Sequence, residues 1–399
     1  LFATNDPKKT YIYSTVDPAG EWEKVMDLNE RYHDTSLLFD DDGRIYIAGG
    51  SGSIRLHEMK SDLSGVMEDG LNVEVINGEE RDLKGLLEGT HLCKYNGKYY
   101  MFLIWWPKGG IRTQVAFRSD KIEGPYEQQV ILSDDMDRRG AGVAQGGIID
   151  TEDGRWYGFL FQDRGAVGRV PVLMPCRWEN GWPMLGDAEG KVPLVMDMPV
   201  VGQKETPLVI SDDFDSPRLA LNWQWNHNPD NTLWSLTERK GYMRLKTGKV
   251  VQTIFEARNM LSQRTEGPVC RGVVSLDVSN MKDGDIAGLS AYCSEPGIIS
   301  VNMENDKMYL VMTDRNTEKE RVELIQNVVY LRLDCDFNHG TDKANFYYSL
   351  NNKDWTKLGT EFRMVYNLKH FMGNRFGIFN YATKAAGGYV DVDVFEYTR

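Results

Sequence analysis

The sequence has few of the features that mark disulfide-rich, zinc-binding, membrane-spanning or nucleic-acid-binding proteins. Its five cysteines, at positions 93, 176, 270, 293 and 335, are scattered, odd in number and free of C-x-x-C spacing. We therefore expect buried thiols rather than a disulfide framework or a zinc site. No apolar run reaches the length of a membrane-spanning helix, so no membrane association is expected. The formal net charge is −13, with no basic patch, which argues against nucleic acid as a partner.

Helical periodicity is nearly absent up to about residue 200, and a hairpin pattern recurs instead. The pattern is Asp or Asn, then Gly, a cation, any residue and an aromatic, and it occurs at 42–46, 96–100 and 153–157. An Asp-Gly or Asn-Gly step between apolar runs favours a tight hairpin turn, because glycine accepts a positive φ. The glycines are 54 and 57 residues apart (97 − 43 and 154 − 97). A period in the fifties with several short strands is typical of β-propeller blades.

Three blades are expected, at residues 30–80, 85–135 and 140–200, and residues 1–28 carry only the tail of an earlier blade. A propeller closes its ring with about four to eight blades. The chain also begins inside an expected strand, at residues 1–4, so we expect an N-terminal piece of the propeller to be missing. The alternative is an ordinary β-sandwich whose hairpins are alike by chance.

The repeat also singles out three polar residues. Counting back nine positions from each hairpin glycine gives Asp34, Glu88 and Gln145. Each is expected on the innermost strand of its blade, so the three side chains can converge on a shared centre although they are far apart in the sequence. Repeat position alone leaves other interpretations open: Asp34 could cap a turn, and Glu88 could be one solvated carboxylate among 59 acidic residues.

Several further motifs follow one another along most of the chain. They are HDTSLLF at 33–39, EGTHL at 88–92, QGGIID at 145–150, GR at 168–169, WENGWP at 178–183 and DDFD at 212–215. In this order they resemble glycoside hydrolase family 43, the β-xylosidases and α-L-arabinofuranosidases. The resemblance implies an all-β protein, in which a five-bladed propeller (N-terminally incomplete here) is followed by a lectin-like β-sandwich. It also implies hydrolysis with inversion at the anomeric carbon.

The resemblance assigns roles to individual residues. Glu88 would be the general acid, and Asp34 would modulate the acidity of Glu88 and orient the substrate. Arg169 would contact sugar hydroxyls and the catalytic carboxylates. Gln145 stands where many family members have a histidine near an axial metal or water, so metal binding there is in doubt. The general base, an Asp early in the first blade, has no counterpart in this sequence, because the chain is expected to begin after it.

Neighbouring residues are candidates for substrate contacts. Trp105 and Trp106 end the hairpin that starts at Glu88, and aromatic faces suit the apolar faces of sugar rings, but blade packing would explain both equally well. His33 flanks the carboxylates and is a further candidate, although it could simply pack or donate a hydrogen bond. Neither His33 nor His91 has partners at metal-ligand spacing, so no catalytic metal and no required cofactor are expected.

The second half of the chain has strand-like alternation without the blade repeat. A proline-bounded linker at 199–207 separates the two parts, which gives a propeller domain at 1–205 and a β-sandwich domain at 206–399. The tryptophans within 222–229 could present rings to sugar, but core or interdomain packing is favoured. Acidic residues near Asp212, together with Asp391 and Asp393, could hold a structural Ca²⁺, whose ligands are oxygens.

These observations predict an exo-acting hydrolase that releases xylose and/or arabinose from xylan-derived oligosaccharides or arabinoxylan. The two sugars share hydroxyl topology near the reacting centre, so the sequence does not rank them. Because the base is missing, we expect the polypeptide alone to be inactive or nearly so. An N-terminal fragment or a partner chain that completes the propeller would then restore activity. The alternative function is a non-catalytic glycan-binding protein.

Overall fold

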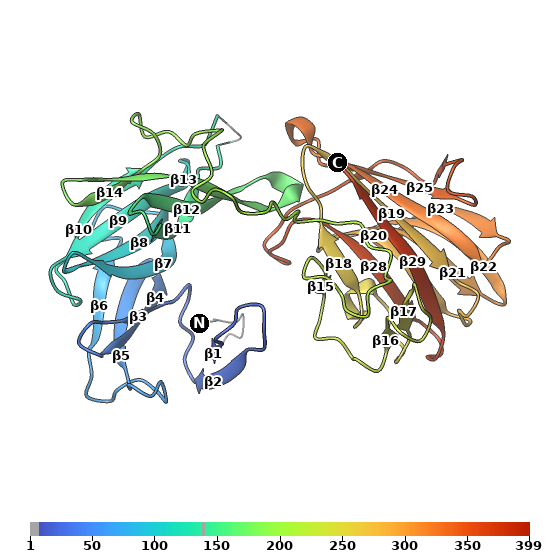
Figure 1. Ribbon diagram of the computed structural model, residues 1–399, viewed down its shortest axis with the longest axis horizontal. Coiled ribbons are helices and arrows are strands. Elements are labelled where there is room, and N and C mark those ends of the chain that lie inside the picture. The colour runs from blue at the N-terminus through green and yellow to red at the C-terminus, as the bar shows by residue number, and fades with distance from the viewer. Residues whose placement is uncertain (1–7, 138–139) are drawn as a thin grey trace. The chain divides into compact units, whose positions relative to one another are not determined.

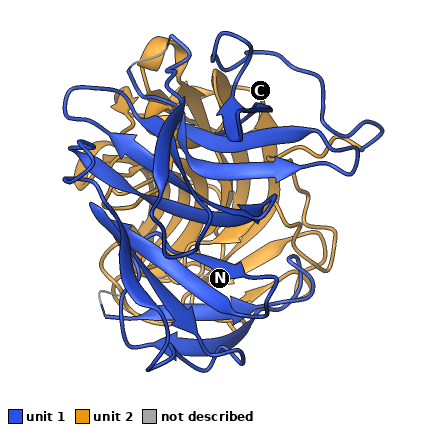
Figure 2. Cartoon of the chain, turned by 90° about the vertical axis from the view of Figure 1, so that its left-hand side faces the viewer, with its two compact units in different colours: residues 1–163, 170–203 blue, residues 164–169, 204–399 orange. Residues whose placement is uncertain are grey.

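The computed structural model describes residues 8–137 and 140–399 and consists almost entirely of β-strands (Figure 1). It divides into two compact units, shown in Figure 2: unit 1 comprises residues 1–163 and 170–203, and unit 2 comprises residues 164–169 and 204–399. The main division lies two residues before the boundary expected from the sequence (205 − 203). In the described part, no helix has the length and apolar character to cross a membrane. The strand expected at residues 1–4 lies outside the described residues.

Unit 1 has one two-stranded and three four-stranded antiparallel sheets among its described residues, each with strands in sequence order: β1–β2, β3–β6, β7–β10 and β11–β14. The strands are β1 (Thr10–Ser14), β2 (Glu23–Leu28), β3 (Ser36–Phe39), β4 (Ile45–Ser51), β5 (Ser53–Met59), β6 (Asn72–Asn77), β7 (Leu86–Tyr95), β8 (Lys98–Trp106), β9 (Thr113–Ser119), β10 (Glu127–Leu132), β11 (Ala144–Asp150), β12 (Trp156–Asp163), β13 (Arg169–Glu179) and β14 (Trp182–Leu185). Each four-stranded sheet lies inside one of the three expected blades.

The recurring glycines form the predicted hairpin turns. Between β7 and β8 the turn has two residues, and Asn96 and Gly97 both adopt positive φ, at 48° and 74°. This conformation matches the right-handed twist of the flanking strands. Gly43 and Gly154, at φ 85° and 80°, end the equivalent turns of the other two sheets. The glycines therefore fix the hairpin that begins each sheet.

Neighbouring sheets of unit 1 pack face to face, because their strands alternate between two buried faces. In β8, Met101 and Leu103 pack toward the sheet β3–β6, whereas Tyr100 and Phe102 pack toward the sheet β11–β14. The strands β1 and β2 pack in the same way, on β4 and β5. As a consequence the first strands meet: β7 contacts both β3 and β11. Figure 1 shows the three sheets in order from blue through cyan to green.

Unit 2 is a sandwich of two antiparallel sheets with strand orders β15-β18-β28-β20-β21-β22-β23 and β16-β17-β29-β19-β24-β25-β26, and β27 pairs with β25. Its elements are β15 (Gln224–Trp225), β16 (Trp234–Ser235), β17 (Met243–Lys246), β18 (Leu261–Arg264), β19 (Val269–Asp277), β20 (Asp285–Tyr292), β21 (Gly297–Glu304), β22 (Lys307–Asp314), β23 (Thr317–Leu324), β24 (Val328–Asp336), β25 (Lys343–Ser349), β26 (Thr356–Lys357), β27 (Phe362–Arg363), β28 (Arg375–Ala382) and β29 (Tyr389–Thr398), with short 3-10 turns at Gly165–Val167, Ile254–Glu256 and Asn338–Gly340.

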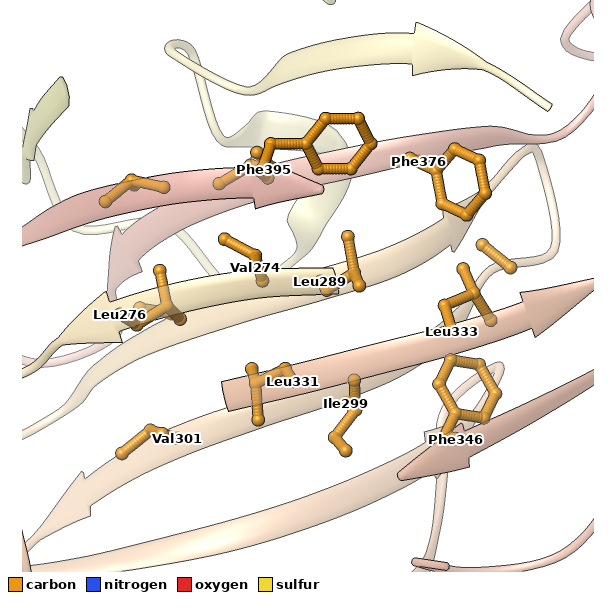
Figure 3. Close-up of a cluster of buried hydrophobic side chains, with 14 of the residues drawn as sticks. Val274, Leu276, Leu289, Ile299, Val301, Leu331, Leu333, Phe346, Phe376 and Phe395 are labelled. Carbon is orange, nitrogen blue, oxygen red and sulfur yellow. The ribbon is translucent and has the colours of Figure 1, made fainter. Parts of the chain in front are cut away.

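The core of unit 2 lies between its two sheets (Figure 3). Leu289 and Ile299 from one sheet and Val274 and Leu331 from the other are fully buried there. Trp223 is also buried, which confirms the packing interpretation of the tryptophan-rich segment for this residue. All five cysteines are free thiols, and four of them are buried, as expected.

Two of the carboxylates considered for Ca²⁺, Asp391 and Asp212, have other partners in unit 2. Asp391 is buried and accepts hydrogen bonds from Arg244 Nε at 2.7 Å and from Arg239 Nη1 at 3.0 Å. Asp212 accepts one from Trp223 Nε1 at 2.7 Å. Two guanidinium groups thus already neutralise Asp391, so a cation would have to depend mainly on Asp212 and Asp393.

A structural Ca²⁺ at these residues stays a prediction. If such an ion holds the strands together, adding EDTA should lower the melting temperature of the protein, because binding to the folded state alone stabilises it. The measurement is thermal unfolding with EDTA, with EDTA plus excess Ca²⁺, and with neither. An unchanged melting temperature would reject the ion.

Asp285, the first residue of β20, is a carboxyl group in an unfavourable place. It is fully buried, Oδ2 accepts one hydrogen bond from the Lys282 amide at 2.7 Å, and Oδ1 has no hydrogen-bond partner among the described residues. Burial disfavours the charged form and so raises the pKa of Asp285. A raised pKa favours folding below the unfolded-state value of about 3.9, and this contribution is lost as pH rises through the folded-state pKa.

We expect Asp285→Asn to melt at a higher temperature than the wild type at pH 8, and the difference to vanish near pH 3. Asp283→Asn is the matched control: this nearby exposed carboxylate accepts a hydrogen bond from Lys384, which lowers the pKa of Asp283. Its replacement should therefore reduce stability at pH 8. Thermal unfolding followed across pH tests both, and a melting temperature of Asp285→Asn that tracks the wild type at every pH would contradict the account.

Candidate active site

The three positions selected by the repeat lie at the start of the first strand of each sheet. Asp34 precedes β3, Glu88 lies in β7 and Gln145 lies in β11. The pairing of β7 with β8 shifts register between Glu88 and His91, and that of β11 with β12 shifts between Ala144 and Gly147. Such bulges redirect side chains at the ends of strands and are frequent beside active sites. At Glu88 and Gln145 the repeat therefore shares a register shift as well as an equivalent residue position.

These side chains, together with His33, form one connected group. Gln145 Nε2 donates to Asp34 Oδ2 at 3.1 Å, and His33 Nε2 lies 2.9 Å from Glu88 Oε2 and 3.8 Å from Asp34 Oδ2. One atom each of His33, Asp34 and Glu88 lies within 4.8 Å of the others. The side chains are 35%, 32% and 19% exposed, respectively. The group is thus enclosed enough to be fixed and open enough to meet a ligand.

Main-chain hydrogen bonds between neighbouring sheets place this group. The Thr90 amide donates to the Asp34 carbonyl at 3.2 Å, and the Gly52 amide donates to the Leu87 carbonyl at 2.8 Å. The Leu92 amide also donates to Ser36 Oγ at 3.0 Å. The sheet β3–β6 and the residues just before it are therefore tied to β7 on both sides of Glu88.

Gln145 has an unusual backbone conformation, which is stabilised by a hydrogen bond to a residue of another sheet. Its φ is 68°, in the left-handed region that non-glycine residues rarely adopt. The fully buried Gln114, on β9, accepts a hydrogen bond from the Gln145 amide at 2.7 Å. The sequence analysis missed Gln114 and also Ser51, whose Oγ donates to Glu88 Oε2 at 3.1 Å. The available signal for Gln114 was a polar residue inside a strand that is otherwise buried.

The two tryptophans have different environments. Trp105 pairs with Leu87, packs against the core between two sheets, and donates from Nε1 to the Lys84 carbonyl at 3.2 Å. Trp106 is 41% exposed, and the Arg112 guanidinium lies 4.8 Å from the centre of its ring. Trp106 is therefore the better candidate for a sugar-binding surface, whereas blade packing explains Trp105.

Arg169 belongs to unit 2, unlike the rest of the predicted site. The segment 164–169 clusters with the sandwich, where Arg169 Nε donates to Tyr366 Oη at 3.2 Å and the guanidinium lies 4.7 Å from the Phe371 ring centre. Its role in sugar binding stays a prediction.

The residues around Gln145 do not fit the axial metal suggested by the family resemblance. An imidazole at this position would offer a ring nitrogen to a metal, whereas the Gln145 amide nitrogen donates to Asp34. His33, Asp34 and Glu88 are close enough to share an ion, but a divalent cation would keep Glu88 deprotonated and engage the oxygen that His33 and Ser51 contact. We therefore derive no step of the chemistry through a metal.

Comparison with known proteins finds a family match in each of the two units. The model of glycosyl hydrolases family 43 matches residues 2–183, and that of the beta xylosidase C-terminal concanavalin A-like domain matches residues 211–398. A putative beta-xylosidase of Xylanibacter ruminicola is 30% identical over 91% of this chain and 68% of its own length. A beta-xylosidase of Formosa agariphila is 29% identical over 97% of this chain and 73% of its own length.

Among solved structures, a chain described as a bifunctional GH43-CE protein of Bacteroides eggerthii is 46% identical over 99% of this chain, with a TM-score of 0.90. The present chain spans about half of that chain, 51% of its length. The similar solved structures combine a propeller with a sandwich, and these two parts correspond to unit 1 and unit 2 of this chain.

Replacing Gly89 with alanine should disturb the site more than the fold. Gly89 has φ +76°, and a Cβ there would lie 2.8 Å from Gln145 Cγ, so alanine would push away the residue that contacts Asp34. Gly97→Ala is the matched control, because Gly97 has φ +74° with nothing within 4 Å. Both should lose about 1–2 kcal/mol of stability from backbone strain, measured by denaturant unfolding.

In the active form of the protein, only Gly89→Ala should also lower kcat for an aryl glycoside, by roughly the tenfold or more that misplacement of a catalytic group costs. Equal activity of the two variants would show that the Gln145–Asp34 contact does not matter for turnover.

Proposed function

Because this chain belongs to glycosyl hydrolases family 43, we propose that it is an inverting, exo-acting hydrolase. Its products would be xylose and/or arabinose from xylan-derived oligosaccharides. The observation that carries the proposal is the group formed by Glu88, Asp34 and His33, which two segments of the propeller bring together at a partly exposed position. A protonated carboxyl beside a second carboxylate is what glycoside hydrolysis requires.

In the proposed reaction Glu88 is the general acid. Its proton passes to the glycosidic oxygen as the bond between that oxygen and the anomeric carbon breaks, which leaves Glu88 as a carboxylate. Water attacks the anomeric carbon from the opposite face and gives its proton to a carboxylate base. In inverting enzymes the acid and the base are about 6.5–9.5 Å apart, so that water fits between them.

Asp34 is too close to Glu88 to be that base, since oxygens of the two residues lie within 4.8 Å. This supports the role that the family resemblance gives to Asp34, which is to adjust the acidity of Glu88 and to orient the sugar. The base is then a further carboxylate. We propose that an N-terminal segment or a partner chain supplies this carboxylate.

The short Asp34–Glu88 separation favours one alternative chemistry. Retaining glycosidases have their two carboxyl groups about 5–5.5 Å apart, and the second one attacks the anomeric carbon directly. In that mechanism Asp34 would be the nucleophile. The two mechanisms give opposite anomers of the released sugar, so stereochemistry distinguishes them.

The substrate class follows from the relatives and agrees with the chain's own features. Both curated relatives described above are named as β-xylosidases, one of them putatively. A formal charge of −13 suits an uncharged sugar, and Trp106 offers an exposed aromatic face near the end of the Glu88 hairpin. Arabinose is kept beside xylose, because the two sugars share hydroxyl topology near the reacting carbon.

We expect turnover of aryl β-D-xyloside or aryl α-L-arabinofuranoside, and we expect Glu88→Gln to lower kcat on xylobiose by about 10²–10⁴-fold, because the amide cannot donate a catalytic proton. The first xylose released should be the α-anomer by NMR, and the β-anomer would instead make Asp34 a nucleophile. Arg44→Ala is the control, because Arg44 lies in the neighbouring sheet β3–β6, on an exposed hairpin turn.

If this polypeptide alone shows no turnover, the assay is repeated after an N-terminal segment that completes the propeller has been added. Sugar binding without turnover in both forms would overturn the proposal and leave a glycan-binding protein.

A further inference from the structure

His33 is held from both sides of its ring by charged residues of unit 1. On one side, Arg31 Nη2 lies 3.2 Å from His33 Nδ1. On the other side, His33 Nε2 lies 2.9 Å from Glu88 Oε2. A third charged group among the described residues, Asp34, also faces the ring, with Oδ2 3.8 Å from Nε2. Arg31 is exposed, so this chain of contacts runs from the protein surface to the candidate acid.

The contact with Arg31 determines which nitrogen of His33 carries the proton. A guanidinium group donates hydrogen bonds and cannot accept them. Nδ1 must therefore present its lone pair to Arg31, and the ring proton must be on Nε2. A second proton on Nδ1 would face the Arg31 donor at 3.2 Å. With the ring proton on Nε2, the N–H group of His33 points at Glu88.

This tautomer has a consequence for Glu88. Its Oε2 accepts one hydrogen bond from His33 Nε2 at 2.9 Å and another from Ser51 Oγ at 3.1 Å. A carboxyl oxygen has two lone pairs, and both donors use them, so no place remains on Oε2 for the acidic proton. The proton is then left on Oε1.

We propose that Arg31 and His33 are positioning residues that put the acidic proton of Glu88 on Oε1, from which it passes to the leaving group. This rests on the proposed role of Glu88 as the acid. When the proton has passed from Oε1 to the glycosidic oxygen, His33 Nε2 and Ser51 Oγ stabilise the carboxylate that remains by donating hydrogen bonds to Oε2. In this arrangement the ring nitrogens of His33 contact Arg31 and Glu88, and the substrate contact expected from the sequence stays a prediction.

The first test needs no turnover. In protein labelled with ¹⁵N in histidine, the chemical shifts of the His33 ring nitrogens report the tautomer, and a spectrum of His33→Gln identifies the signals that belong to His33. We expect a protonated Nε2 and a bare Nδ1 in the wild type and in Arg31→Lys, which keeps a donor. A proton on Nδ1 of the wild type would overturn the proposal.

The second test separates positioning of the acid from general damage. A 2,4-dinitrophenyl β-D-xyloside needs almost no protonation of its leaving group, whereas xylobiose does. His33→Ala should lower kcat on xylobiose by roughly 10- to 100-fold, a part of the 10²–10⁴-fold effect of a whole acid. Its kcat on the dinitrophenyl substrate should change less than about threefold, and KM should stay within about twofold on both.

Variants that restore or retain the contacts complete this test. His33→Gln can place an amide N–H near the position of Nε2 and should recover most of the loss on xylobiose. Arg31→Ala should show the same selective loss as His33→Ala, whereas Arg31→Lys should not. Equal losses on the two substrates, or a raised KM alone, would mean a structural or substrate-binding role for His33 and would contradict the proposal.

Failure of this inference can be told apart from failure of the proposed function. If Glu88→Gln hydrolyses xylobiose as fast as the wild type, the proposed role of the acid is wrong, whatever the tautomer. If Glu88→Gln is impaired but His33→Ala is not, the acid stands and the positioning role is wrong.

Discussion

The candidate site depends on hydrogen bonds between the inner ends of neighbouring propeller sheets. The Thr90 amide donates to the Asp34 carbonyl, and the Gly52 amide donates to the Leu87 carbonyl. β7 is the edge strand of its sheet, so its free side offers unpaired amides and carbonyls, and the register shift beside Glu88 interrupts its pairing with β8 at the same place. The free edge of β7 thus joins one sheet to the next and brings residues 55 positions apart, His33 and Glu88, into contact.

The same region carries backbone strain. Asp34 and Gln145 adopt φ values of 44° and 68°, and such conformations cost of order 1–3 kcal/mol each where a side chain is present. The fully buried Gln114 side chain offsets part of this cost, because its Oε1 accepts a hydrogen bond from the Gln145 amide. The packing of three sheets therefore holds a polar group in a geometry that an isolated hairpin would not adopt.

The sequence was sufficient for the repeat and insufficient for the contacts between repeats. The Asp-Gly and Asn-Gly steps identify the hairpins, because a local turn depends only on neighbouring residues. Counting from them locates Asp34, Glu88 and Gln145. Ser51 and Gln114 are different: each acts through a residue of another segment, so no local pattern marks it. Arg169 shows the same limit, since its segment clusters with unit 2 although it lies between two strands of unit 1.

In the sandwich, strand-like alternation was recognisable in the sequence, but not every strand carries it. The segment Arg375–Ala382, which forms β28, is buried at nearly every position and so has no period of two. It pairs with β18 and β20 in the middle of its sheet, which explains the burial. Tertiary environment, which the chain itself creates on folding, replaces the local signal there.

The central claim is that Glu88, Asp34 and His33 form the point where a glycosidic bond is broken. The most direct measurement is a crystal structure of Glu88→Gln with xylotriose bound. The account predicts the glycosidic oxygen of the non-reducing sugar within hydrogen-bond distance of the residue at position 88, with Asp34 beside the same sugar. Ordered xylotriose bound elsewhere, for example only on the sandwich of unit 2, would contradict it.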